Sequence, residues 1–321
     1  MSEPVSYRGS GVDLDAARRH TAAISSLVSG GTTGFAAARP MPAGLTEPMI
    51  VTATDGVGTK LLLARALDRM DGLGQDLVAM SVNDLACTGG RPLGFLDYLA
   101  VGALDPDEAG ALVGSIAAAC EACGCELVGG ETAEMPGLYA PGHFDLAGFA
   151  YGVVDRSVMW GPHRVGAGDL VMGIPSSGLH SNGYTLVRAL VDGGHLAPDP
   201  DLLLAPTRLY AAELVRLNET GVTVHAAAHI TGGGLGENLP RAMPTGLRAA
   251  LDAASWEVGR AAETVLATGA LSSREAWATF NMGLGMCLIV PEASTAGVTA
   301  VIPDARVVGW VEEGEPGVRF V

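Results

Sequence analysis

Residues 49–60 constrain the fold more than any other part of the sequence. The β-branched run Ile50-Val51-Thr52 predicts a short buried strand. Asp55-Gly56 interrupts that run, and apolar residues then recur at helical spacing over 61–70. Glycines in a strand-to-helix turn let backbone N–H groups approach a ligand closely, and the N-terminus of a helix favours an anion. The stretch therefore predicts an α/β fold with an anion site on this turn.

The same turn carries side chains that suit phosphate chemistry. Asp55 could hold a divalent cation, and Lys60 could reach a phosphate as a point charge. Among the 19 lysine and arginine residues only Lys60 is a lysine, which favours a site that needs a compact ammonium, with chance as the alternative. Gly56, Gly58 and Thr59 complete the turn, but their spacing to the lysine differs from that of a Walker P-loop.

The length and composition predict a globular protein of two domains. The chain has 321 residues, of which 48% are hydrophobic and 17% are charged, so a sizeable core can form. A turn-rich segment at 162–168 is the expected boundary. It separates an N-terminal domain, residues 1–165, from a C-terminal domain, residues 166–321.

The formal net charge of −16 argues against nucleic acid and anionic membrane surfaces as partners. The chain shows neither a basic-then-apolar leader nor a long uncharged apolar run, so we expect a cytoplasmic protein without a membrane span. Five cysteines are an odd number and point to reduced thiols. Cys120, Cys123 and Cys125 lack a second pair of metal ligands, and we expect them to pack as small apolar residues.

Both halves of the chain predict the same order of strand, glycine-rich turn and helix. In the first half we expect strands at 50–52, 92–101, 126–128 and 144–154, and helices at 15–28, 61–70, 73–87 and 108–121. The strand at 126–128 is expected to end in a turn at 129–137. In the second half we expect strands at 169–174, 225–230, 247–251 and 284–291, and helices at 184–191, 203–217 and 257–267.

Three carboxylates, those of Asp55, Asp84 and Glu131, lie next to glycine or asparagine in predicted turns or at the ends of elements. In an acidic protein such groups are unfavourable to cluster unless a cation joins them. Mg²⁺ keeps several waters and bridges a few carboxylates to phosphate oxygens. The sequence therefore suggests a Mg–nucleotide site made from three turns, and three solvated turn carboxylates are the equally weighted alternative.

Two of the seven histidines, His180 and His229, lie beside glycine-rich turns, where a backbone can approach a substrate. A histidine in such a place could carry a proton or stabilise an oxyanion. A hydrogen-bonded surface histidine is the common alternative. From the residues alone, the chain is predicted to be an acidic, cytoplasmic, two-domain α/β enzyme that handles phosphate, with its acceptor open.

The order of the motifs resembles the phosphoribosylformylglycinamidine cyclo-ligases, also called aminoimidazole ribonucleotide synthetases, of purine biosynthesis. The match extends over residues 7–285. The motifs that carry it are Gly11-Val12-Asp13, Thr54-Asp55-Gly56-Val57-Gly58-Thr59-Lys60, Val82-Asn83-Asp84-Leu85, Phe95-Leu96-Asp97-Tyr98, Leu127-Val128-Gly129-Gly130-Glu131-Thr132-Ala133-Glu134-Met135-Pro136-Gly137, Ser176-Ser177-Gly178-Leu179-His180-Ser181-Asn182-Gly183-Tyr184, Leu204-Ala205-Pro206-Thr207-Arg208, His229-Ile230-Thr231-Gly232-Gly233-Gly234 and Thr279-Phe280-Asn281-Met282-Gly283. One departure is Gly94, which stands where the family commonly has an aromatic residue.

The resemblance implies an ATP-dependent ring closure of formylglycinamidine ribonucleotide to 5-aminoimidazole ribonucleotide. ATP would phosphorylate the amide oxygen, a nitrogen of the same molecule would attack that carbon, and phosphate would leave. The implied fold is a mixed α/β one, in which the N-terminal strands form a barrel across a homodimer and a layered C-terminal domain closes the substrate cleft.

The resemblance also implies roles for individual residues, with ATP and Mg²⁺ as cofactors and a phosphoribosyl amidine as the substrate. The implied catalytic residues are Lys60, His180 and His229, and the implied metal ligands are Asp55, Asp84 and Glu131. ATP and its phosphates would contact Asp55, Gly56, Gly58, Thr59, Lys60, Asn83, Gly129, Gly130 and Thr132. The substrate would contact Ser181, Asn182, Thr231, Gly232 and Gly233.

Two alternatives remain. Relatives of the same fold phosphorylate thiamine monophosphate, selenide or carboxamide groups, but the loop at 30–38 has no reactive cysteine and residues 317–321 include none. A nucleotide-binding dimer without turnover is the non-enzymatic alternative. The presence of Lys60, Asp84, Glu131 and His229 argues against it.

Overall fold

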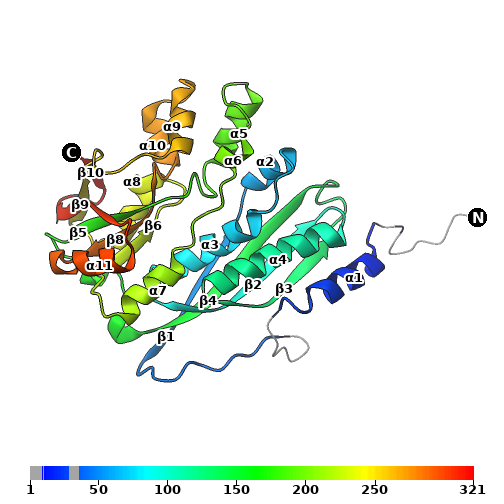
Figure 1. The fold of residues 1–321 in the computed structure, drawn as a ribbon, viewed down its shortest axis with the longest axis horizontal. Helices are drawn as coiled ribbons and strands as arrows, with labels where there is room; N and C mark the ends of the chain where they lie inside the picture. The colour runs from blue at the N-terminus through cyan, green and yellow to red at the C-terminus, as the bar shows by residue number, and fades with distance from the viewer. Residues whose placement is uncertain (1–8, 10, 29–35) are drawn as a thin grey trace, which may run out of the picture.

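The computed structural model describes residue 9, residues 11–28 and residues 36–321. It contains a four-stranded sheet and a six-stranded sheet, which lie next to each other with helices packed against them (Figure 1). The mixed α/β class expected from the sequence is confirmed. The loop at 30–38, apart from its last residues, and the segment before Gly9 lie outside the described residues.

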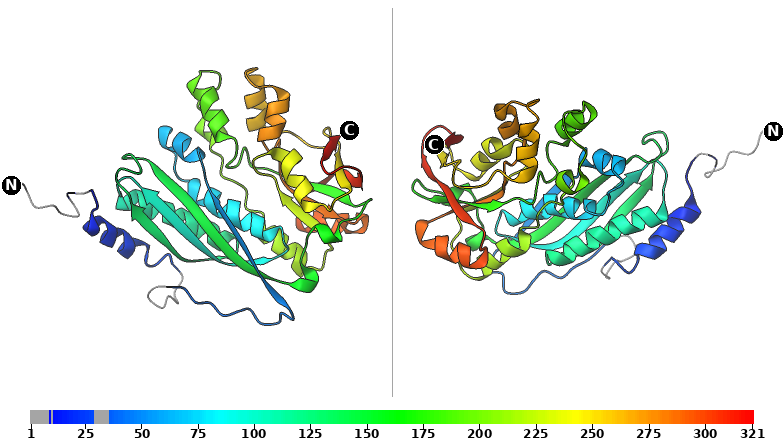
Figure 2. Two further views of the ribbon diagram at one scale, coloured as in Figure 1. Left: turned by 180° about the vertical axis from the view of Figure 1, so that it is seen from behind. Right: turned by 45° about the horizontal axis from the view of Figure 1, so that its top comes forward.

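The first sheet holds β1 (Pro48–Gly56), β2 (Arg91–Val101), β3 (Glu126–Glu134) and β4 (Phe144–Asp155), in the order β1-β4-β2-β3. β2 and β3 are parallel, and the other neighbours are antiparallel. Helices α3 (Leu73–Ala86) and α4 (Pro106–Ala122) cover one face of this sheet, and α1 (Leu14–Ile24) lies beside α4 (Figure 2). Short helix α2 (Lys60–Ala66) follows β1 directly.

Local chemistry explains how α3 and α4 form and pack. The side chain of Asp105 caps α4 by accepting hydrogen bonds from the backbone N–H groups of Asp107 and Glu108, and Pro106 occupies the first turn. Gly74 brings the two helices close, because a Cβ there would lie 2.5 Å from the backbone nitrogen of Ile116. The small residue therefore sets the distance between the helices that back the sheet.

The other face of the first sheet carries exposed apolar side chains. Ile50 is 68% exposed, Phe149 41% and Tyr98 38%. The strand registers place all three on one face, because Thr54 pairs with Phe149, which in turn pairs with Leu96. This surface, hereafter the open sheet face, is not covered by α3 or α4.

Gly94 is explained by its cross-strand neighbour. Gly94 of β2 pairs with Tyr151 of β4, and a Cβ at 94 would overlap the Tyr151 ring. The aromatic ring over this position therefore comes from the adjacent strand instead of from residue 94. Packing an aromatic side chain over a cross-strand glycine is a known way to stabilise such a site.

The six-stranded sheet has the order β10-β7-β9-β5-β8-β6. Its strands are β5 (Leu170–Pro175), β6 (Ala226–His229), β7 (Leu247–Leu251), β8 (Leu284–Val290), β9 (Arg306–Glu313) and β10 (Val318–Phe320). The surrounding helices are α5 (Tyr184–Asp192), α6 (Pro200–Leu203), α7 (Ala211–Glu219), α8 (Gly234–Asn238), α9 (Arg260–Ala267), α10 (Ser273–Thr279) and α11 (Thr295–Val301). Helix α7 also packs against α3, so the two halves share an interface.

Three sequence predictions need correction. The helix expected at 203–217 is two helices, α6 and α7, because the segment 204–210 contains Pro206 and binds α3 through its backbone. The strand expected to end at 128 continues to Glu134, because residues 129–134 pair with β2. The helix expected at 61–70 ends at Ala66.

Cys120, Cys123 and Cys125 are buried in the core and are free thiols, as expected. No helix in the described part of the chain is long and apolar enough to cross a membrane.

Candidate active site

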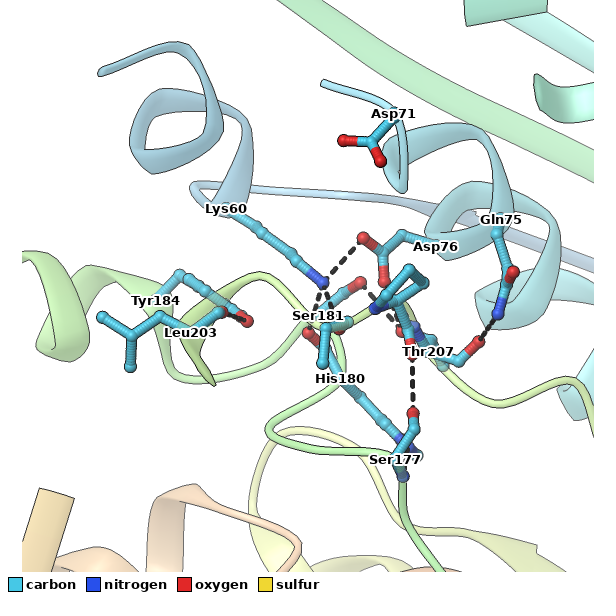
Figure 3. Close-up of polar contacts among 12 residues, drawn as sticks. Lys60, Asp71, Gln75, Asp76, Ser177, His180, Ser181, Tyr184, Leu203 and Thr207 are labelled. Atoms are coloured by element: carbon cyan, nitrogen blue, oxygen red, sulfur yellow. Dashed lines mark hydrogen bonds and ion pairs between the residues drawn. The ribbon is translucent and has the colours of Figure 1, made fainter. Parts of the chain in front are cut away.

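Lys60 lies at the start of α2 with its side chain fully buried, and it takes part in a network that joins the two halves of the chain (Figure 3). Its Nζ lies 2.7 Å from Oδ2 of Asp76 on α3. It also donates to the backbone oxygens of His180 and Ala205, both at 3.0 Å. Burial lowers the pKa of the Lys60 ammonium, and Asp76 opposes that fall.

This placement does not agree with the prediction that Lys60 reaches a phosphate. An ammonium has three N–H donors, and each of the three oxygens around Lys60 can take one of them. The compact ammonium binds oxygens of the protein itself instead of a phosphate. The side chain holds two backbone carbonyls of the second half against α3.

His180 lies in the turn between β5 and α5, in the left-handed region of backbone conformation with φ 59°. Its ring is buried, and Nε2 accepts a hydrogen bond from the backbone N–H of Ser177 at 3.2 Å. Burial first, and then His229, Lys60 and Arg208, hold the pKa of His180 well below its ordinary value. His180 is therefore a neutral imidazole whose proton is on Nδ1, and that atom has no hydrogen-bond partner within the described residues.

The structure brings His180 and His229 together around Tyr210. The ring centroids lie 6.3 Å apart between the two histidines, 6.2 Å between His180 and Tyr210, and 6.3 Å between Tyr210 and His229. Gly285 of β8 makes this arrangement possible, since a Cβ there would overlap the Tyr210 hydroxyl. Tyr210 is anchored by donating from its hydroxyl to the backbone oxygen of Pro175.

His229, at the end of β6, is oriented by Asp84, near the C-terminal end of α3. Asp84 Oδ1 lies 2.8 Å from His229 Nδ1. When the carboxylate accepts the Nδ1 proton, neutral His229 presents a lone pair at Nε2. Nε2 is buried and has no hydrogen-bond partner among the described residues.

Asp55, at the end of β1, is close enough to this pair for their charges to interact. Burial is the main cause that raises the pKa of Asp55, and Asp84 raises it further. The N–H of Gly56 and the nearby His229 act in the opposite direction. Two neighbouring carboxylates in this setting offer the oxygen ligands that Mg²⁺ prefers. The residues present therefore fit a magnesium ion at Asp55 and Asp84.

Glu131 does not join this group within one chain. The strand registers run from Asp55 to Gly148, then to Asp97 and Gly130, so three strand spacings, about 14 Å, separate β1 from β3. Glu131 pairs with Tyr98 and so faces the open sheet face, opposite to Asp55. Across the described residues, no set of three or more His, Cys, Asp or Glu side chains is placed to hold a metal ion. The convergence of Asp55, Asp84 and Glu131 within a single chain is thus not observed.

Glu131 lines a separate cavity of about 730 Å³ between α1, β2 and β3, together with Gly129, Gly130 and Thr132. Two residues in this cavity, His20 and Asp97, were not predicted as site residues. His20 is 2% exposed and its Nε2 lies 3.0 Å from the Thr132 hydroxyl. Asp97 is 8% exposed, and burial raises its pKa to about 6.

Three other residues predicted to contact ATP, Gly58, Thr59 and Asn83, have structural roles within the chain. Gly58 has φ 72°, which glycine adopts readily, and the Thr59 hydroxyl lies 3.0 Å from that of Thr185 on α5. Asn83 is buried and binds the backbone of the 204–210 segment, donating to Arg208 and accepting from Tyr210. Asn83 therefore fixes the segment that carries Tyr210.

The predicted substrate residues lie on two neighbouring turns. The Asn182 side-chain nitrogen is buried with no hydrogen-bond partner in the described part of the chain. A Cβ on Gly232 would lie 3.5 Å from Asn182 Oδ1, so the turns at 180–183 and 231–234 approach each other. The side-chain amide of Asn238 binds the backbone oxygens of Thr231 and Gly232, and Gly233 has φ 89°. Ser181 Oγ lies 3.2 Å from Thr207 Oγ1.

Asp76 and Thr207 were missed as members of the site. Asp76 Oδ1 accepts from the backbone N–H of Thr207 at 2.8 Å and from its hydroxyl at 2.6 Å. A sequence signal existed, because Asp76 is a charged residue among the apolar residues of a helix. Buried charges are paired, so it required a cation partner.

Comparison with known proteins matches this architecture to one class. Residues 42–154 match the N-terminal domain of AIR synthase related proteins, and residues 166–321 match their C-terminal domain. The fold and site thus define an AIR synthase related protein. The chain is 43% identical to the phosphoribosylformylglycinamidine cyclo-ligase of Parasynechococcus marenigrum (strain WH8102), covering 97% of both chains. It is also 43% identical to that of Thermosynechococcus vestitus, covering 95% of this chain and 94% of the relative. The chain belongs to the phosphoribosylformylglycinamidine cyclo-ligase family.

Solved structures share the fold at lower identity. Hydrogenase maturation protein HypE in complex with ATP superposes with a TM-score of 0.73 at 18% identity, covering 95% of this chain and 90% of that one. Thiamine-monophosphate kinase from Stenotrophomonas maltophilia superposes with a TM-score of 0.66 at 20% identity, covering 96% of this chain and 95% of that one. T. maritima PurL complexed with AMPPCP gives 0.59 at 15% identity, covering 95% of this chain and 46% of that one.

Proposed function

We propose that this chain is an ATP-dependent cyclo-ligase that closes formylglycinamidine ribonucleotide to 5-aminoimidazole ribonucleotide, releasing ADP and phosphate, in purine biosynthesis. The observation that carries the proposal is the sequence identity of 43% to the cyclo-ligase of Parasynechococcus marenigrum, which extends over nearly the whole of both chains. The alternative is an enzyme of the same fold that phosphorylates another acceptor. It rests on solved structures with sequence identities of only 18–20%, which support the fold alone. A carbon–nitrogen bond is formed, so the enzyme is a ligase.

The reaction needs an activated oxygen and an aligned nitrogen more than it needs a covalent enzyme intermediate. An amide oxygen leaves poorly, and phosphorylation by ATP turns it into a phosphate leaving group. Neutral His180, with its proton on Nδ1, suits hydrogen bonding to an oxygen that gains charge. His229, with Nε2 as a lone pair and Asp84 behind it, suits the removal of a proton from the attacking nitrogen.

ATP and Mg²⁺ are the proposed cofactors. Asp55 and Asp84 would hold the ion, which supplies positive charge to the transferring phosphoryl group. The turn around Gly56, Gly58 and Thr59 lies beside these carboxylates and could approach the phosphates through its backbone N–H groups. The cavity beside Gly129, Gly130 and Thr132 is large enough for part of a nucleotide. ATP use follows from the proposed ligase reaction, and two neighbours of the same fold were solved with ATP or AMPPCP.

A homodimer would bring Asp55 and Asp84 of one copy close to the β3 residues that line the separate cavity of the other copy. The open sheet face needs a cover, and β1 and β3 are the outer strands of their sheet. If two such sheets close into one barrel, β3 of each copy approaches β1 of the other. Gly130 and Thr132 of the partner's β3, which face the same side of the sheet as Asp55, would then lie beside the Asp55 end of β1, while Glu131 would face the inside of the barrel. The five free cysteines support a reducing, cytoplasmic location.

The test is to incubate the purified protein with ATP, Mg²⁺ and the amidine ribonucleotide, and to measure ADP and the aminoimidazole product together. Equal amounts of the two are expected. ADP released without ring closure would contradict the proposal and favour a kinase of the same fold.

A further inference from the structure

We propose that the buried Lys60–Asp76 ion pair positions the active-site turn at residues 176–183 and does not bind nucleotide. The pair would set the location of His180 and Ser181 through their backbone and through Thr207. This inference rests on the proposed function, because it assigns those two residues to the substrate side of the site.

The first argument is that both charged groups already have partners inside the protein. Neither side chain of the pair is exposed. Lys60 Nζ has three oxygen neighbours at 2.7, 3.0 and 3.0 Å, and an ammonium has three donors. Asp76 Oδ1 accepts two bonds from Thr207. A phosphate could recruit Lys60 only if these bonds broke and Asp76 became a buried, unpaired charge, which is strongly unfavourable.

The second argument is the identity of the carbonyls that Lys60 holds. One belongs to His180, whose backbone is in the left-handed region. That conformation is uncommon for residues other than glycine, so the bond from Lys60 helps to hold it. The other carbonyl belongs to Ala205, two residues before Thr207. Lys60 and Asp76 therefore fix two separate segments of the second half from two helices of the first (Figure 3).

The third argument explains why this position is lysine in a chain that otherwise uses arginine. The ammonium lies 5.4 Å from the centre of the Tyr184 ring and is fully enclosed. A guanidinium is larger and planar, and its five donors would need more acceptors than the three oxygens here. A compact group with three donors fits the enclosed space.

The test uses Lys60→Met, Asp76→Leu and the double variant K60M/D76L. Breaking a buried ion pair from one side leaves an unpaired charge, whereas replacing both partners with apolar residues of similar size is often neutral for stability. We expect each single variant to lower the melting temperature and the double variant to recover most of it. The kcat of the double variant should remain about a hundredfold below wild type, because a small misplacement of reacting groups costs that much. The KM for ATP should stay within about threefold of wild type, since uniform binding of ATP is unaffected.

Two other outcomes would overturn the proposal. If the double variant recovers both stability and kcat, the pair is only a structural contact. If the KM for ATP rises at least about tenfold in every variant, Lys60 is a nucleotide ligand. Arg65→Met is the matched control, since Arg65 is a partly exposed cation on the same helix and pairs with Glu108. It should leave kcat and the KM for ATP unchanged.

A readout without turnover separates this proposal from the proposed function. The imidazole nitrogens of ¹⁵N-histidine report the tautomer and environment of His180 by NMR, with the signal assigned through His180→Gln. We expect the His180 signal to change in K60M/D76L while that of exposed His195 does not. An unchanged His180 signal in that variant would overturn the positioning role even if the wild-type enzyme lacked cyclo-ligase activity. Absence of wild-type turnover alone would overturn only the proposed function.

Discussion

Asp84 Oδ1 lies 2.8 Å from Nδ1 of His229, a contact that joins the last turn of α3 in the first half of the chain to the end of β6 in the second. The same carboxylate raises the pKa of Asp55. Asp84 therefore has two proposed roles, because it orients His229 and would share a magnesium ion with Asp55. These two roles make different predictions.

Replacing Asp84 with Asn should lower kcat by about a hundredfold, in the range for loss of general-base assistance. Because the amide is neutral, it should also raise the Mg²⁺ concentration for half-maximal activity by at least about tenfold. Initial rates across a magnesium titration measure both effects. Glu121→Gln, an exposed carboxylate on α4, is the control and should change neither. A lower kcat with an unchanged magnesium requirement would restrict Asp84 to orienting His229.

Asp97 should make the folded protein less stable as the pH rises. Burial raises its folded pKa to about 6, above the ordinary value of 3.8. Between these values the native state binds the proton and the unfolded state does not, so the free energy of unfolding falls as the pH increases. Asp97→Asn should therefore stabilise the protein by about 1–3 kcal/mol at pH 8 and have little effect at pH 4. Urea unfolding at the two pH values measures this, and equal effects at both would contradict it.

Gly130→Ala should damage the cavity between α1 and β3. A Cβ at 130 would overlap Asp97 Oδ1, so the strand or the carboxylate must move. We expect a loss of about 1–3 kcal/mol in the free energy of unfolding and weaker ATP binding. Gly110→Ala on α4 is the matched control, because open space surrounds it and alanine favours the helix. Combining Gly130→Ala with Asp97→Ala should recover only part of the stability, because the new Cβ would still lie 2.7 Å from the backbone oxygen of Asp97, and no recovery at all would show that the carboxylate is not the main obstacle.

Placing a charge on the open sheet face should dissociate the proposed homodimer. Ile50→Asp and Phe149→Glu each replace an exposed apolar side chain of that face with a carboxylate. Sedimentation velocity should show a dimer for the wild type and monomers for the variants, with activity lost in parallel. Val307→Asp, an exposed apolar position on β9, is the control and should remain dimeric. Active monomers would contradict a site that is completed by β3 of the partner subunit.

Much of the fold follows from local sequence patterns. The position of Asn83-Asp84 near the end of a helix is confirmed, because the apolar period of α3 is regular. The length of β3 was underestimated, because glycines at 129 and 130 normally indicate a turn. Here Gly130 stays in the strand to make room for Asp97, a partner on another strand that a single-sequence pattern does not reveal.

Contacts between distant segments also limit how much of the site can be predicted from the sequence. The unusual status of Lys60 was visible in the sequence, but its partner was not, since Asp76 approaches it only after α2 and α3 pack together. The predicted convergence of Glu131 with Asp55 treated three turns as neighbours. The sheet order places two strands between them, and strand order is a long-range property.

The central claim is that ATP activates the amide oxygen of the amidine ribonucleotide for ring closure, and isotope transfer tests it most directly. The substrate is labelled with ¹⁸O at the formyl amide oxygen, and the released phosphate is examined by mass spectrometry after turnover. Our account predicts that the label appears in the phosphate, with one labelled phosphate for each aminoimidazole formed. Ring closure with unlabelled phosphate would contradict it.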